Sequence, residues 1–115
     1  MVKNKKYISI SFLILFLLPN IAYSIESAVH KVEVAKCFGI IMTIKNNSKY
    51  ENNIIKATNI IEIYLEKIIS LNIGSIMMKE MSEEAANEVF DKLETHTSSS
   101  LDNLLNKCIN TLRIG

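Results

Sequence analysis

The stretch YENNIIKATNIIEIYLEKIIS, residues 50–70, decides the fold class. Its apolar residues recur at alternating spacings of three and four, and the series is Ile54, Ala57, Ile61, Tyr64, Ile68 and Leu71. Ile60 and Leu65 widen this stripe, and the opposite side carries Lys56, Asn59, Glu62 and Glu66. This period predicts an amphipathic helix with one buried face. Gly74 lies just beyond it, where a residue able to take positive φ commonly caps a helix.

The segment upstream, residues 26–44, becomes continuously apolar after Cys37. Cys37, Ile40, Ile41 and Ile44 fall on one helical face, and Phe38 and Met42 lie on another. We therefore predict a helix that is buried on most sides over its second half. A strand remains the alternative, because Val32 and Val34 flank Glu33 and isoleucine is frequent here. Asn46, Asn47 and Ser48 provide the turn that follows.

Two more helices are predicted downstream. Ser82 is the expected N-cap of the third, with Glu83 and Glu84 in its first turn, and residues 82–96 are expected to be helical. Its apolar positions repeat every four residues at Met81, Ala85, Val89 and Leu93. Ser99 and Asp102 resemble a capping box at the start of the fourth. The inner stripe of that helix is Leu101, Leu104, Leu105, Cys108 and Leu112. The predicted fold is all-α, a small four-helix bundle-like domain.

The two cysteines, Cys37 and Cys108, each fall on the apolar stripe of their own predicted helix. They are the only cysteines in the chain, so they permit one intramolecular disulfide. A bridge across the intervening chain would stabilise the fold by about 4 kcal/mol on the chain-entropy model. Two separate buried thiols are the alternative.

The amino end resembles a secretory signal peptide. Lys3, Lys5 and Lys6 precede an apolar run over residues 8–18, and small residues stand at Ala22 and Ser24. The run is shorter than the roughly 20 residues that a membrane-spanning helix needs. We therefore expect residues 1–24 to be removed and residues 25–115 to form one helical domain. Export to the periplasm or beyond supplies the oxidising compartment in which the disulfide forms.

Composition narrows the function further. The chain has 115 residues, of which 49% are hydrophobic and 22% charged, and a formal net charge of +1. This is the composition of a folded domain rather than of a disordered tail. Loss of the three leader lysines would change the net charge to −2. A surface without excess positive charge disfavours nucleic acid as a partner.

The sequence contains few groups of residues that are typical of a catalytic or metal-binding site. The two histidines, His30 and His96, fall in different predicted elements, and a zinc site would need them together with Glu33 or Glu94. The sequence contains no glycine-rich phosphate loop, nucleophile elbow or HExxH pattern. Glu83, Glu84 and Glu88 are explained by the start of a helix as well as by acid–base chemistry. We therefore expect that the protein is not an enzyme, that it has no catalytic residue and that it binds no cofactor or metal.

The most suggestive cluster follows residue 72. Large apolar side chains crowd this connection, at Ile73, Ile76, Met77, Met78 and Met81. If they stay exposed they would form a surface for a protein partner or a second copy of the chain. The alternative is that the third helix begins at Ser75 and simply packs there. A different alternative is a copper carrier, because thioether sulfurs of Met77, Met78 and Met81 are soft ligands for Cu(I).

One local resemblance concerns the segment AKCFGII, residues 35–41, together with the distant Cys108. It resembles the Cys-x-Gly helix of small exported all-helical two-cysteine proteins of Gram-negative bacteria. Some immunity proteins against type VI secretion toxins are similar in size, export and cysteine use. The resemblance implies a bacterial helical periplasmic domain and carries no site residues. From these observations we expect an exported non-catalytic binding or accessory protein, a class that includes immunity or inhibitor proteins and accessory subunits of envelope machinery.

Overall fold

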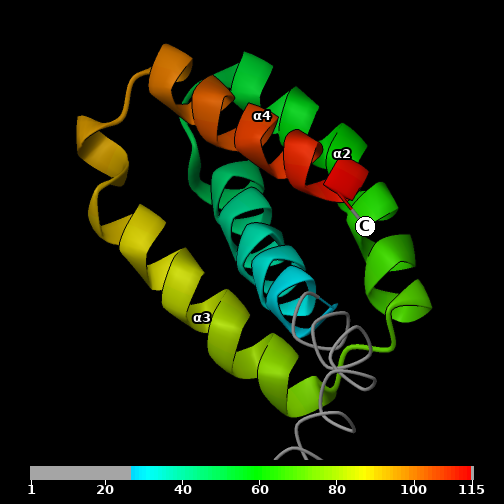
Figure 1. The fold of residues 1–115 in the computed structure, drawn as a ribbon. Coiled ribbons are helices and arrows are strands. Elements are labelled where there is room, and N and C mark those ends of the chain that lie inside the picture. The colour runs from blue at the N-terminus through cyan, green and yellow to red at the C-terminus, as the bar shows by residue number, and fades with distance from the viewer. Residues whose placement is uncertain (1–26, 115) are drawn as a thin grey trace, which may run out of the picture.

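The computed structural model describes residues 27–114, and these are almost entirely helical (Figure 1). The first helix covers residues 27–47. It is followed by α2 (Glu51–Ser70), α3 (Ser75–Asp91), the short 3₁₀ helix η1 (Leu93–Thr95) and α4 (Ser98–Ile114). No strand occurs among these residues. The all-α prediction is confirmed, and helix prevails over strand in the segment around Cys37.

Three of the helices provide most of the core, to which α3 adds Val89. Helices α2 and α4 lie side by side and run in the same direction, because contacts between them join positions about equally far along each helix (Figure 1). Asn53 meets Ser98, Lys56 meets Asp102, and Tyr64 meets the backbone of residue 108. The 27–47 helix runs the opposite way beside both. The buried core residues on these three helices are Val34, Cys37, Ile41, Ile44, Ala57, Ile60, Ile61, Tyr64, Leu101, Leu105 and Cys108.

The 27–47 helix is buried on more than one side, as its sequence predicts. Ile41 and Ile44 on its inner face are fully buried, and so is Ala35 on the far side of the same helix. The reason is its central place: α2 and α4 cover one side, and α3 covers the other (Figure 1). A helix that is apolar on most sides has to be enclosed in this way.

Helix α3 packs against the 27–47 helix and contacts the short helix η1 that follows it. No Cα atom of α3 lies within 8 Å of one in α2 or α4. Helix α3 and the 27–47 helix approach closely at Gly39, where a Cβ atom would lie 2.0 Å from the carbonyl oxygen of Ser82. Only Ala85 and Val89 of α3 are buried. The domain is therefore a three-helix core with a fourth helix on one flank, which refines the predicted bundle.

The turn after α2 is built differently from its prediction. The residue with positive φ is Asn72, at 54°, and not Gly74, whose φ is −67°. The amide of Ile73 donates to the carbonyl of Ile68, and the amide of Asn72 donates to that of Ile69. These are the two bonds of a Schellman motif, and Asn tolerates the left-handed conformation that the motif requires. Gly74 instead precedes the first residue of α3.

The predicted start of the third helix, Ser82, is wrong. Helix α3 begins at Ser75, which was the alternative reading of this segment. Ser82 lies mid-helix, where its hydroxyl donates to the carbonyl of Met78, four residues earlier. Glu83 and Glu84 are therefore not in the first turn, and the helix dipole does not account for them. The helix ends at Asp91, and residues 93–95 form η1.

The capping box of the fourth helix is shifted by two residues from its predicted place at Ser99 and Asp102. Thr97 and Ser100 form it instead. The amide of Ser100 donates to the hydroxyl of Thr97 at 3.1 Å, and the amide of Thr97 donates to the hydroxyl of Ser100 at 2.8 Å. Asp102 is free for another role and accepts a 2.6 Å hydrogen bond from the ammonium of Lys56 on α2.

Two further expectations concern the membrane and export. Among residues 27–114, no helix is both long enough and apolar enough to cross a bilayer. The predicted signal peptide, residues 1–24, lies outside the described residues.

Candidate functional site

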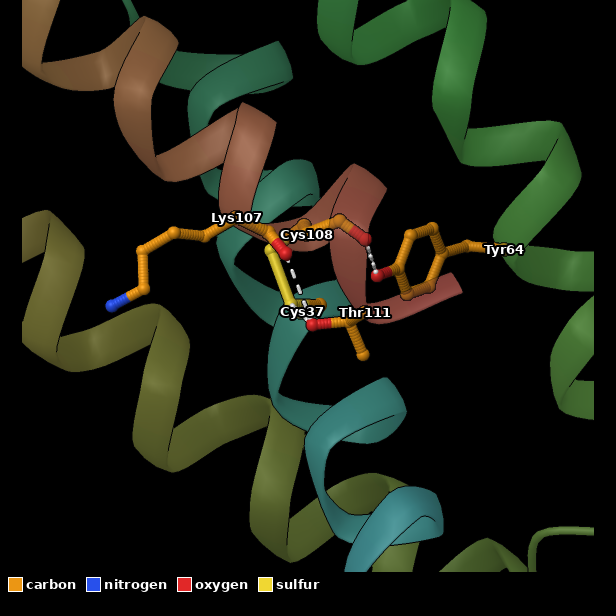
Figure 2. The surroundings of a disulfide bond; sticks show 5 residues. All are labelled: Cys37, Tyr64, Lys107, Cys108 and Thr111. Atoms are coloured by element: carbon orange, nitrogen blue, oxygen red, sulfur yellow. Dashed lines mark hydrogen bonds between the residues drawn. A yellow bond between two sulfur atoms is a disulfide. The ribbon is translucent and has the colours of Figure 1, made fainter. Parts of the chain in front are cut away.

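The predicted cysteine pair lies at the centre of the core. Cys37 on the 27–47 helix and Cys108 on α4 have Cα atoms 5.6 Å apart and are joined as a disulfide (Figure 2). Both side chains are buried. The sequence prediction of their pairing is therefore confirmed, and the bridge ties the first described helix to the last.

Tyr64 adds a buried hydrogen bond next to the disulfide. Its side chain is fully buried, and its hydroxyl donates a hydrogen bond to the backbone carbonyl of Cys108 (Figure 2). Burial, together with the nearby carboxylate of Glu33, raises the pKa of Tyr64 far above its ordinary value. The phenol thus keeps the proton that it donates. With its cysteines bonded to each other and its phenol held by backbone, this cluster is a structural centre.

The predicted partner-binding residues gather around the turn between α2 and α3. We call them the junction surface: Ile73, Ile76, Met77, Met78 and Met81. Ile76 is 74% exposed, and Ile73 is partly buried and packs against the core. The three methionines lie in the first two turns of α3 and are each partly buried. None of the three is among the partly buried residues that pack against the core.

The sequence missed a neighbour of this surface. Ile69, in the last turn of α2, is 79% exposed, more than any other large apolar side chain in the part of the chain that the structure describes. Along the chain it precedes the Asn72 turn, and Ile76 follows that turn. Its place outside the inner stripe of α2 was the available signal, since Ile69 does not share the spacing of Ile61, Tyr64 and Ile68. A large apolar residue off the buried stripe has nothing within its own helix to cover it.

The histidines do not meet. His30 is beside Lys67, near the end of α2, whereas His96 precedes α4, whose start packs beside the start of α2. Burial and then the positive charge of Lys67 lower the pKa of His30. Its buried Nε2 has no hydrogen-bond partner. His96 Nδ1 lies 2.9 Å from the hydroxyl of Ser100. The structure therefore does not bring together the residues of the zinc site that the sequence analysis considered.

The three glutamates considered for acid–base chemistry lie on the surface of α3. Glu83, Glu84 and Glu88 are all exposed on α3. Within residues 27–114, no group of three or more His, Cys, Asp or Glu side chains is placed to hold a metal ion. Met78 and Met81 lie one turn apart on α3, the spacing on which the copper alternative depends.

Two of the surface hollows lie against the 27–47 helix. One, of about 390 Å³, lies where the 27–47 helix turns into α2, and its wall includes Tyr50, Leu93, Glu94 and Leu101. The other, of about 270 Å³, follows the groove between the 27–47 helix and α3 beside Gly39 and Ser82. Comparison of the chain with protein-family models, with curated proteins and with solved structures finds no match to any of them.

Proposed function

We propose that this is an exported, non-catalytic protein-binding domain of the periplasm that recognises its partner through the junction surface. The observation that carries the proposal is the exposure of Ile69 and Ile76 on the two sides of one tight turn, at 79% and 74%. Patches of exposed apolar residues typically mark sites of interaction, and we propose that these two residues form one with the methionines of α3. The partly exposed methionines beside them are flexible enough to fit a partner's surface. An immunity or inhibitor role is the finer form of this proposal.

Partner capture tests the proposal. Full-length tagged protein, exported in a bacterial host, is purified from the periplasm with Ile76→Gln or Met77→Gln in place of the natural residue. We expect a stoichiometric protein partner with the natural chain and its loss with either variant, while circular dichroism stays unchanged. Phe90→Gln is the matched control, because Phe90 is an exposed apolar residue near the other end of α3. Loss of helix content in the Ile76 or Met77 variants would show that these residues serve packing.

The copper-carrier alternative is favoured by one observation, the one-turn spacing of Met78 and Met81 on α3. Titration of the purified protein with Cu(I) against a competing chelator separates it from protein binding. A copper carrier binds one ion, and Met78→Leu with Met81→Leu removes that binding while conserving the apolar surface. Under the protein-binding proposal the same double substitution leaves partner capture intact.

A further inference from the structure

Helix α2 carries a second stripe besides the one that packs in the core. Starting at its first residue, the positions 51, 55, 58, 62, 65 and 69 alternate spacings of four and three. These spacings place the residues in one row along the helix. We call this row the outer seam: Glu51, Ile55, Thr58, Glu62, Leu65 and Ile69.

The outer seam is uncovered in the described residues. Ile55 is 52% exposed, Leu65 46% and Ile69 79%, and the other three members are exposed as well. The cause is the arrangement of the helices. The 27–47 helix and α4 pack on the inner side of α2, and the 27–47 helix separates α2 from α3 (Figure 1). The hydroxyl of Thr58 donates to the carbonyl of Ile54, so a facing surface need not provide a hydrogen bond for it.

The charge of the outer seam has one sign. Glu51 and Glu62 lie within it and Glu66 lies beside it, all three exposed. The one ion pair of residues 27–114 joins Lys56 to Asp102, on the side of α2 that meets α4. Thus none of the three carboxylates forms an ion pair with a lysine or arginine within the described part of the chain, and the outer seam itself contains no basic residue.

We propose that the outer seam binds an amphipathic helix of a partner protein whose apolar stripe is flanked by lysine or arginine. The alternating spacing fits a helix laid along α2 in the manner of a coiled coil. Ile55 to Ile69 spans about 21 Å of helix axis, enough for roughly four turns of contact. Basic residues at the flanks of the partner would pair with Glu62 and Glu66 and favour the correct partner over others.

A second copy of the chain does not satisfy the same requirement. In a symmetric pair the outer seam would face itself, and it offers only carboxylates at its charged positions. Like charges brought together at an interface are unfavourable. The proposal rests on the protein-binding function that is also proposed for the junction surface, and Ile69 adjoins both sets of residues. The two proposals are separated by their variants, because Glu62→Lys with Glu66→Lys alters only the outer seam and Met77→Gln alters only the junction surface.

Two synthetic peptides of about 20 residues test the proposal. Both carry leucine at alternating spacings of three and four, and the flanking positions are all lysine in one and all glutamate in the other. Fluorescence anisotropy with the purified natural protein should show about tenfold tighter binding of the lysine peptide, an advantage lost near 1 M salt, where charges are screened beyond about 3 Å. Equal affinity for the two peptides would overturn the proposal.

Charge reversal makes the test specific to the outer seam. Glu62→Lys with Glu66→Lys should reverse the preference, so that the glutamate peptide binds more tightly. The control is Glu84→Lys with Glu88→Lys, which changes the net charge equally but on the exposed side of α3. Reversal in the control would ascribe the effect to net charge and overturn the proposal. A dimer of the natural protein in sedimentation that Leu65→Lys dissociates would overturn it too, with a second copy as the occupant.

Discussion

The three-helix core and α3 are held by different kinds of interaction. The core has a disulfide, the buried Tyr64 hydroxyl, the Asn53 side chain bonded to the carbonyl of Ser98 and the Lys56–Asp102 pair. Helix α3 buries two small or medium side chains, Ala85 and Val89, and depends on a close backbone approach at Gly39. Local stability follows the density of buried contacts. The comparison implies that α3 opens more readily than the rest.

The largest effect on stability is expected from removing the disulfide of the core. Replacing Cys37 and Cys108 together with serine should lower the free energy of unfolding by about 4 kcal/mol, because the bridge closes a long loop in the unfolded chain. Guanidinium unfolding followed by circular dichroism measures the change. Natural protein under a strong reductant should match the double variant. An unchanged midpoint in both would contradict the role given to the bridge.

The second prediction concerns a substitution that displaces α3 and leaves the three-helix core in place. Gly39→Ala puts a methyl group where only 2.0 Å separates it from the Ser82 carbonyl oxygen, so α3 has to shift. We expect a loss of about 1–3 kcal/mol and faster hydrogen exchange in the α3 amides than in those of α2 or α4.

Gly74→Ala is the matched control for this change. A methyl group there meets nothing within 4 Å, and its φ of −67° suits alanine, so the effect should stay within about 1 kcal/mol. If Gly39→Ala accelerated exchange equally in all helices, the core and α3 would form one cooperative unit and the comparison would fail.

A smaller effect tests the hydrogen bond of Tyr64. Tyr64→Phe leaves the ring in place and removes the hydroxyl that donates to the Cys108 carbonyl. The expected loss is about 1 kcal/mol of unfolding free energy, the usual net value of one hydrogen bond. Tyr50→Phe, at a partly buried tyrosine near the surface hollow, should be close to neutral. Equal losses in the two variants would assign the effect to something other than this hydrogen bond.

The smallest effect depends on pH. The pKa of His30 is lowered in the folded protein, so the unfolded chain binds a proton more readily at this residue. Above the ordinary pKa of about 6.5, protonation of His30 therefore does not lower the free energy of unfolding. As the pH falls below that value, the unfolded chain is protonated first and the free energy of unfolding decreases. Thermal melts at pH 7.5 and about 5.5 should show a smaller acid-induced drop for His30→Gln than for the natural chain. A drop of equal size in the natural chain and in His30→Gln would contradict the role of His30.

The sequence predicted well what depends on regular spacing. The stripe of α2, the apolar face around Cys37 and the inward position of Cys108 each follow from a helical period. The cysteine pairing needed no geometry, because two cysteines allow one intramolecular pair. These predictions concern which residues share a face, and burial of that face then fixes the packing of the helices.

The sequence predicted less well what depends on competition between nearby residues. Ser82 is a good N-cap residue, but the preceding apolar residues extend α3 to Ser75, and its hydroxyl bonds within the helix. Asn72 takes the left-handed position although a glycine stands two residues away. The role of Gly39 also escaped prediction, because close contact between two helices depends on residues far apart in the chain.

The position of the disulfide along the chain has a consequence for biosynthesis. Cys37 and Cys108 are separated by 71 residues, which a ribosome adds in about 4–14 s at 5–20 residues per second. During that interval Cys37 is a free thiol on a helix that still lacks the α4 side chains that bury it. The nascent chain therefore completes its core only after α4 has emerged, and the thiol of Cys37 is open to cellular oxidants and holding factors until then.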